Sequence, residues 1–544
     1  MRTAHYISIL SMLCILLSCA KERGDRRPNI LLIVADDLAY ADIGCYGGNV
    51  KTPNIDRLAA RGLRFSRFHT APMCAPTRAM LLSGNNNHVA GMGSQGGVRE
   101  SSPMHGQPGY EGHLSGRIIP VPMLMKEAGY HTYTAGKWHL GTKEEDSPLA
   151  KGFERSFNLL QGAGNHFNNR GIELKDTIST YREDGRVVDY PEGEYSTDFY
   201  TNKLMEFMKA GLEAKDGKPF FAFAAYTSPH WPLQVPEDYL DRYAGEFDMG
   251  YDSLRKLRFE SLKKAGMIPE GASLPPRLDY ITPWDSLTLE EQRDESRKME
   301  LYAAMVENLD YHVGRLIQFL KSENIYDNTV IIFMSDNGAA KDDFYNEAWS
   351  RDFIRKYYNN DYANMGKVNS FVSYGPQWAH AGAAPFNRFK GFTTEGGMLA
   401  PFIISGVGIP NTGEISDTYF TVMDLAPTFY ELAGIQYPGK MEAEGVHPLL
   451  GNSILPYLQD KATAVHDSAY GTGLEHRGHI YYRKGEWKIV QIERTDDRDN
   501  FMLFNLSNDL GETNDVSNEH PGKFKELIAE WKQFINDNKI IVSK

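Results

Sequence analysis

Cys74 opens a short segment, Cys74-Ala75-Pro76-Thr77-Arg78, whose residue types and spacing suit the binding of an anion. Pro76 is typical of the first turn of a helix and Gly84 of the residue after its end, so Cys74 is predicted to stand at a helix amino terminus. Free backbone N–H groups and the helix dipole attract negative charge there, and Arg78 lies one turn further on the same side. Cys74 could instead be a small buried hydrophobe or a plain thiolate nucleophile, and this segment alone leaves both alternatives open.

Two polar pairs elsewhere in the chain offer hard oxygen ligands for a metal ion. Asp36-Asp37 directly follows an apolar run at residues 30–35. Asp336-Asn337 follows a second apolar run at residues 330–334 and Ser335. Carboxylate and amide oxygens suit Ca²⁺ or Mg²⁺, whereas zinc prefers histidine and cysteine. Either pair alone could simply cap a turn or a helix, but two such pairs in one chain favour a metal site.

Basic residues and histidines form a third group. Lys137 and His139 follow one apolar run, His230 follows another, and Lys390 stands in a glycine-rich segment. Each of them singly could be an ordinary surface or loop residue. The chain as a whole carries a net charge of −13, so an anionic substrate needs such a local cationic pocket. The same charge, without any cluster of lysine and arginine to offset it, excludes nucleic acid as the main partner.

The elements that must position these residues are short apolar runs that alternate with helical patterns. The runs cover residues 30–35, 131–135, 220–224 and 330–334, and the helical patterns include residues 55–62, 121–129 and 300–321. Runs without polar alternation are typical of strands buried on both faces. We therefore predict an α/β fold with a large, mostly parallel but mixed sheet flanked by helices. Ligands bind beyond the carboxyl ends of such strands, so the polar clusters should meet there.

The first residues are predicted to direct export. Arg2 precedes an apolar run from Tyr6 to Leu17 that is too short to span a bilayer. The run ends in Leu16-Leu17-Ser18-Cys19, which resembles the lipobox of bacterial lipoproteins. We expect a lipoprotein signal peptide over residues 1–19 and a protein anchored in the periplasm or at the outer membrane through a lipid on Cys19. An ordinary cleaved secretory signal is the alternative.

The rest of the chain is predicted to form a catalytic domain over residues 28–436 and a smaller C-terminal α+β subdomain over residues 437–544. The smaller part contains strand-like pieces at 479–483 and 487–491 and a final helical pattern at 522–536. Residues 341–382 are polar and aromatic and are expected to form a loop-like insertion. Only Cys45 and Cys74 remain in this folded part, so either they pair or one is kept for chemistry.

The Cys-x-Pro-x-Arg segment in this context resembles the signature of type I sulfatases, the formylglycine-dependent members of the alkaline-phosphatase-like superfamily. The resemblance spans roughly residues 28–430 and continues through an ordered set of segments: residues 28–37, 136–141, 228–230, 335–338 and 390–397. Single segments of this set are weak signals, whereas the ordered set is specific. Residues 109–112 and 374–379 look most like bacterial arylsulfatases. Thr77 replaces a serine that is frequent at its position in the family.

This resemblance implies hydrolysis of sulfate esters to an alcohol or phenol and inorganic sulfate. It implies that a formylglycine-generating enzyme or an anaerobic sulfatase-maturating enzyme oxidises Cys74 to formylglycine. It also implies a calcium ion near Cys74, held by Asp36, Asp37, Asp336 and Asn337. The positions that match the family's residues around the sulfate are Arg78, Lys137, His139, His230 and Lys390.

In the implied reaction, one hydroxyl of the hydrated aldehyde attacks sulfur, with Asp336 as base and with the metal lowering the pKa of that hydroxyl. His230 protonates the departing oxygen, a step worth about 10²–10⁴ in rate. The second hydroxyl then loses its proton, to His139, and expels sulfate. Positive side chains offset the charge of the transferring group, namely Lys137, Lys390 and Arg78.

Two other functions stay open at this point. Phosphonate and phosphodiester hydrolases of the same superfamily bind similar tetrahedral anions, so the fold alone does not separate them. The other alternative is a lipid-anchored glycan-binding protein with a decayed site. The chain retains every expected polar residue, which argues against this alternative. The substrate, a sulfated small molecule or glycan, depends on pocket loops, and Trp378 and His380 are candidates for lining that pocket.

Overall fold

The computed structural model of the protein describes residues 27–173, 176–348, 350–438, 445–493 and 500–542. The predicted signal segment, with Cys19, lies outside the described residues. Among the residues that are described, no helix combines the length and the apolar character needed to cross a membrane.

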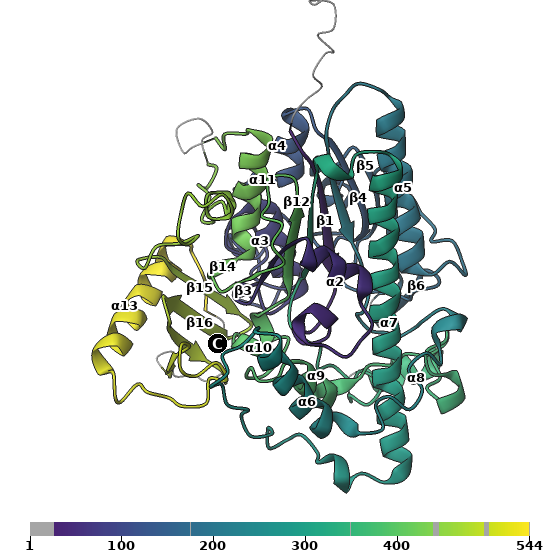
Figure 1. The fold of residues 1–544 in the computed structure, drawn as a ribbon, viewed down its shortest axis with the longest axis vertical. Helices are drawn as coiled ribbons and strands as arrows, with labels where there is room; N and C mark the ends of the chain where they lie inside the picture. The colour runs from purple at the N-terminus through teal and green to yellow at the C-terminus, as the bar shows by residue number, and fades with distance from the viewer. Residues whose placement is uncertain (1–26, 174–175, 349, 439–444, 494–499, 543–544) are drawn as a thin grey trace, which may run out of the picture.

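A ten-stranded sheet forms the centre of the molecule (Figure 1). Its middle five strands run parallel in the order β11-β1-β10-β4-β5. The four apolar runs are confirmed as strands: β1 (Asn29–Ala35), β4 (His131–Lys137), β10 (Phe220–Ala225) and β11 (Thr329–Ser335). The fifth parallel strand is β5 (Arg155–Leu159). The carboxyl ends of these strands therefore lie along one edge of the sheet.

The outer strands make the sheet mixed, as predicted. On one side β12 (Phe402–Gly406) pairs antiparallel with both β11 and β2 (Gly62–Phe65), and β13 (Ile415–Ser416) completes that edge. On the other side β8 (Tyr181–Glu183) and β9 (Arg186–Val188) follow β5 in antiparallel pairing. Two small ribbons lie outside this sheet: β3 (Phe68–His69) with β14 (Phe420–Thr421), and β6 (Arg170–Glu173) with β7 (Asp176–Ile178).

Helices cover both faces of the sheet, which explains the unbroken apolar runs. Leu31 and Ile33 of β1 pack into one core, whereas Ile30, Leu32 and Val34 pack into another on the opposite face. The first face carries α2 (Pro53–Ala60), α5 (Ser196–Glu213) and the long α7 (Leu289–Ser322). The second carries α3 (Cys74–Ser83), α4 (Val121–Glu127) and α11 (Leu425–Ala433).

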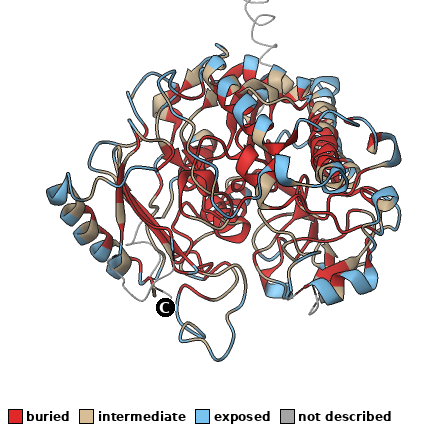
Figure 2. Ribbon diagram, turned by 90° about the horizontal axis from the view of Figure 1, so that it is seen from below, coloured by how far each residue is buried: buried red, intermediate tan, exposed pale blue. Residues whose placement is uncertain are grey.

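A smaller sheet with one helix forms the C-terminal part, as predicted. Its strands pair antiparallel in chain order: β15 (Gly471–His476), β16 (His479–Lys484), β17 (Trp487–Gln491) and β18 (Met502–Asn505). The last helix, α13 (Pro521–Asp537), buries Leu527 and Trp531 against this sheet and exposes its outer face (Figure 2). A short α12 (Leu455–Leu458) precedes the sheet.

The expectation that residues 341–382 are loop-like is wrong in part. This segment contains α8 (Arg351–Tyr357) and α9 (Gly375–Gly382), and α9 packs on α6 (Gly250–Lys264). Trp378 of α9 is fully buried against the rings of Tyr251 and Trp284. Tertiary packing of one large aromatic side chain therefore stabilises a helix that begins with Gly-Pro and has little helical propensity of its own.

Candidate active site

The polar residues that follow the central strands lie together at the carboxyl edge of the sheet. Asp36 and Asp37 follow β1, and Asp336 and Asn337 follow β11, its direct neighbour. The backbone itself ties these ends together, because Asp336 N donates to Ala35 O (3.1 Å) and Asp37 N to Asp336 Oδ1 (3.3 Å). The sequence prediction that these strand ends meet is confirmed.

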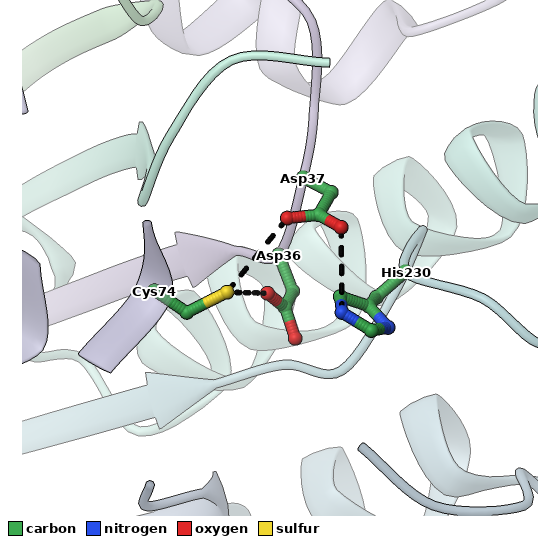
Figure 3. Close-up of side chains that lie close together, drawn as sticks. All are labelled: Asp36, Asp37, Cys74 and His230. Carbon is green, nitrogen blue, oxygen red and sulfur yellow. Dashed lines mark hydrogen bonds and ion pairs between the residues drawn. The ribbon is translucent and has the colours of Figure 1, made fainter. Parts of the chain in front are cut away.

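A buried acidic centre lies at this edge (Figure 3). One ligand atom each of Asp36, Asp37, Cys74 and His230 lies within 4.8 Å of all the others. Asn337 Nδ2 donates to Asp37 Oδ1 (2.7 Å), while Asn337 Oδ1 is buried without any hydrogen-bond partner among the described residues. An oxygen left without a donor beside several carboxylates fits a hard cation such as Ca²⁺ or Mg²⁺.

Cys74 begins α3, as predicted, and points into this centre. Its Sγ atom lies 3.4 Å from Asp36 Oδ1 and 3.8 Å from Asp37 Oδ1. Complete burial raises the pKa of the Cys74 thiol far above its ordinary value, and Lys137 and Lys390 only partly oppose this. The thiol is therefore protonated at neutral pH, which counts against a plain thiolate nucleophile. Cys45 and Cys74 are both free cysteines, so they do not pair.

Three buried cations surround the acidic centre, and each pairs with a different aspartate. Lys137 Nζ contacts Asp36 Oδ2 at 2.7 Å, and Lys390 Nζ contacts Asp37 Oδ1 at 2.6 Å. Arg78 Nη2 and Nε both donate to Asp336 Oδ2, at 2.8 and 3.1 Å. Three positive and three negative side chains therefore balance in this interior, and a bound divalent cation would leave it positive and receptive to an anion.

Asp37 and Asp336 differ in how readily they ionise. Burial acts to raise the pKa of Asp37, but Lys390, His230 and Lys137 outweigh it and hold the pKa well below its ordinary value. Burial and the neighbouring charge of Asp36 raise the pKa of Asp336 to about 6, against the opposing effect of Arg78. Of these two carboxylates, Asp336 is the one that exchanges a proton more readily near neutral pH.

His139 presents a ring nitrogen that no described side chain uses. It follows β4 with a left-handed backbone (φ 60°), and its Nδ1 atom is buried without a partner among the described residues. Burial and the nearby charges of Lys137, Arg78 and Lys390 lower its pKa well below the ordinary value. A neutral ring with an unused nitrogen beside three cations is set up to hydrogen-bond a bound anion.

His230, which follows strand β10, also faces the acidic centre, next to Asp37. Its Nδ1 atom donates to Trp231 O (2.7 Å), and its Nε2 atom lies 3.4 Å from Asp37 Oδ2. Burial lowers the pKa of His230 to about 3, although Asp37 acts to raise it. The bond to the backbone carbonyl fixes the tautomer, so Nε2 is the atom presented to the site.

The loop that carries Lys390 is fixed from several sides. Its backbone donates from Lys390 N to Ala339 O (3.0 Å) and from Gly391 N to Pro72 O (2.8 Å). Glu395, at the start of α10 (Glu395–Met398), pairs with His69 Nε2 (2.7 Å) and with Lys488 Nζ (2.7 Å). Lys488 on β17 also pairs with Glu512 (2.8 Å), so a buried ionic network joins the C-terminal sheet to the Lys390 loop.

The sequence did not indicate which aromatic residues lie beside the site. Trp378, a candidate from the sequence, belongs to the core, and His380 of the same helix is buried beside Arg255, Arg277 and Arg388. Trp231 lies beside the site instead, with its ring 4.2 Å from that of His230 and 4.4 Å from that of Phe344. Its only signal in the sequence was its place next to His230 in a proline-flanked turn.

Comparison with known proteins agrees with this geometry. The family model described as "Sulfatase" matches residues 28–435, and the model described as "N-sulphoglucosamine sulphohydrolase, C-terminal" matches residues 388–540. An uncharacterized sulfatase of Schizosaccharomyces pombe is 40% identical over 528 residues, which cover 94% of each chain. An arylsulfatase of Klebsiella aerogenes is 38% identical over 444 residues, which cover 81% of this chain and 94% of the relative.

Solved structures show the same architecture. The protein Ps i-CgsB, whose structure was determined in complex with k-i-k-neocarrahexaose, is similar with a TM-score of 0.66 and 26% identity. The similarity covers 94% of this chain and 93% of that protein. The predicted alkaline-phosphatase-like fold is thereby confirmed.

Proposed function

The chain belongs to the sulfatase family and is a sulfuric ester hydrolase, and we propose that it works through a formylglycine formed from Cys74 and a bound calcium ion. The observation that carries this proposal is a buried cluster in which Cys74, Arg78, Lys137 and Lys390 contact Asp36, Asp37 and Asp336. The charges of the three cations also act on His139, whose Nδ1 atom has no hydrogen-bond partner among the described residues. Besides their ion pairs with the aspartates, these cations and donors are suited to bind one tetrahedral anion.

The donor set fits the proposed metal. Asp36, Asp37, Asp336 and Asn337 offer oxygen ligand atoms, and Asn337 Oδ1 is buried without a hydrogen-bond partner among the described residues. When both groups are present, formylglycine supplies an oxygen nucleophile that is regenerated in each turnover, and calcium lowers the pKa of that nucleophile. Cys74 itself, as a buried thiol with a raised pKa, lacks this reactivity.

The other side chains have distinct tasks in this proposal. Asp336 accepts the proton of the nucleophile. Lys137, Arg78 and Lys390 bind the sulfate oxygens and stabilise their charge. His230 presents Nε2 and protonates the departing oxygen, and the negative charge of a bound sulfate ester favours the protonated ring.

The substrate is proposed to be a sulfated small molecule or glycan. The similarity to the Klebsiella aerogenes arylsulfatase supports an aryl ester as a usable substrate. The similarity to Ps i-CgsB, solved with a neocarrahexaose, supports a glycan. We further propose that the protein is exported, that Cys19 carries a lipid anchor, and that a formylglycine-generating or anaerobic sulfatase-maturating enzyme modifies Cys74.

The experiment compares rates on 4-nitrophenyl sulfate and 4-nitrophenyl phosphate. We expect faster hydrolysis of the sulfate ester, loss of that activity in Cys74→Ala, and an unchanged rate in Cys45→Ala, the matched control at the second free cysteine. Faster hydrolysis of the phosphate would favour a phosphoryl hydrolase of the same superfamily. No release from any sulfated compound would favour a binding protein.

A further inference from the structure

His166 is a buried histidine that has no part in the proposed reaction. It lies between β5 and β6 and is 1% exposed. Its Nε2 atom lies 3.2 Å from His230 O, and its Nδ1 atom lies 2.6 Å from Ser196 Oγ at the start of α5. Both ring nitrogens are thus engaged in hydrogen bonds, and one of those bonds reaches the backbone of His230.

The two partners determine where the His166 ring carries its hydrogen. A carbonyl oxygen only accepts, so Nε2 holds the hydrogen and donates it to His230 O. Nδ1 then accepts from the Ser196 hydroxyl, whose oxygen lies 3.3 Å from Thr227 Oγ1. Burial lowers the pKa of His166 to about 4, although the bond to His230 O acts to raise it. At neutral pH the ring is therefore neutral and in one tautomer, with a fixed donor toward His230 O.

His166 is itself held in place through its backbone. Its N–H donates to Gln234 Oε1 (2.9 Å), and its carbonyl oxygen accepts from Ser196 N (2.8 Å). Gln234 is buried, and its Nε2 atom donates to Val368 O (3.0 Å) and to Ser370 O (2.8 Å). These bonds join His166 to α5 and to two further segments of the chain, so the donor toward His230 O stands on a rigid support.

The peptide group that accepts from His166 joins His230 to the carbonyl that orients its ring. His230 Nδ1 donates to the next carbonyl along the chain, Trp231 O (2.7 Å), and its Nε2 atom is thereby presented 3.4 Å from Asp37 Oδ2 (Figure 3). A rotation of the peptide between His230 and Trp231 would move Trp231 O away from Nδ1 and turn the ring. The bond from His166 opposes that rotation, because it fixes the carbonyl of the same peptide.

We propose that His166 is a positioning residue that holds the imidazole of His230 in the orientation in which it protonates the departing oxygen. The inference rests on the proposed function, because His230 is taken to be the acid. His166 acts through the backbone of His230 and does not touch the reacting atoms. Without its donor the His230 ring is displaced, whereas the groups that hold the sulfate keep their places. A displacement of about 1 Å in such a group costs up to about 10²-fold in rate.

The test compares sulfate esters whose leaving groups differ in their need for a proton. The oxygen of 4-nitrophenyl sulfate leaves as a stable phenolate, whereas those of phenyl sulfate and hexyl sulfate require the acid progressively more. His166→Phe keeps a ring and removes both hydrogen bonds, and His166→Gln returns an amide N–H near the position of Nε2. His312→Phe is the matched control, because His312 is also buried (3%) but bonds to Arg315 on α7.

We expect His166→Phe to lower kcat for hexyl sulfate by about tenfold to 10²-fold and kcat for 4-nitrophenyl sulfate by less than about threefold. His166→Gln should recover most of the loss, and His312→Phe should leave the ratio of the two rates unchanged. In a His230→Ala background, His166→Phe should cost nothing further on hexyl sulfate. If His166→Phe does not fold, Ser196→Ala carries the test, since it removes the donor to Nδ1 and should lower kcat for hexyl sulfate alone, by about threefold.

A histidine that only filled space in the core would not discriminate between leaving groups. Equal losses on all the esters, or an unchanged rate on hexyl sulfate, would therefore overturn the role of His166 while leaving the sulfatase function intact. A further loss from His166→Phe in the absence of the His230 imidazole would do the same. Equal losses from His230→Ala on all the esters, or a wild-type protein inactive on every one of them, would overturn the proposed function as well.

Discussion

Gly162 offers a way to move His139 without changing any polar group of the site. A Cβ atom at Gly162 would lie 2.5 Å from His139 Cε1 and 2.7 Å from its Nε2. Non-bonded carbon atoms approach to about 3.5–4.0 Å, so Gly162→Ala must displace the ring by roughly 1 Å. The backbone of Gly162 is not left-handed, and the obstructing atoms are the tip of a side chain, so the fold itself should accept the change.

The expected consequence is a catalytic loss without a loss of stability. A displacement of this size in a positioned group costs up to about 10²-fold in rate. We expect Gly162→Ala to lower kcat for 4-nitrophenyl sulfate by that order, while the free energy of unfolding changes by less than about 1 kcal/mol. Gly116→Ala is the control, because a Cβ atom there meets nothing within 4 Å.

A double-mutant cycle separates this effect from a general disturbance. If Gly162→Ala acts through His139, it should cost nothing further in a His139→Ala background. The reasoning is refuted if Gly162→Ala retains a rate within twofold of the wild type, or if its cost is the same with and without the imidazole.

Three other perturbations test separate parts of the site. His230→Ala should slow the hydrolysis of alkyl sulfates by about 10²–10⁴ but that of 4-nitrophenyl sulfate much less, because 4-nitrophenolate leaves without protonation; equal losses in steady-state assays on both would contradict the acid role. Removal of metal with EGTA should abolish hydrolysis and lower Tm in thermal unfolding, and Ca²⁺ should restore both, because a ligand that binds only the folded chain stabilises it; an unchanged Tm would count against the site. Burial raises the pKa of Glu512 to about 7, with Glu395 adding to this against Lys488, so the folded chain holds this proton more tightly than the unfolded chain. The free energy of unfolding should therefore fall as pH rises from about 4.5 to 7, and denaturant titrations of Glu512→Gln should show a smaller fall; identical slopes would remove Glu512 from the explanation.

Local pattern predicted the centre of the fold well, because the strands there carry their own signal. Residues 30–35 and 330–334 are apolar on both faces, and the polar residues directly after them must lie at one edge of a parallel sheet. The helix at Cys74 was equally readable from Pro76 and Gly84, whose left-handed backbone (φ 65°) closes it. Strand β2, which lies between β12 and the edge strand β13, is only four residues long and was not distinguished from its surroundings.

What the sequence could not predict depends on contacts between distant segments. The pairing of Lys137 with Asp36 and of Lys390 with Asp37 joins residues 101 and 353 positions apart. No local pattern distinguishes these lysines from surface lysines until the fold removes them from solvent. Trp378 was likewise misjudged from the sequence. Its aromatic side chain suggested a pocket wall, but the folded chain buries it in a packed core. The network around Lys488 likewise exists only because the C-terminal sheet packs on α10.

Mass spectrometry of the peptide that contains residue 74, taken from active protein, tests the central proposal most directly. The account predicts that residue 74 has lost its sulfur and carries an aldehyde, and that sulfate release scales with the modified fraction. An intact Cys74 thiol in protein that releases sulfate at full rate would contradict it.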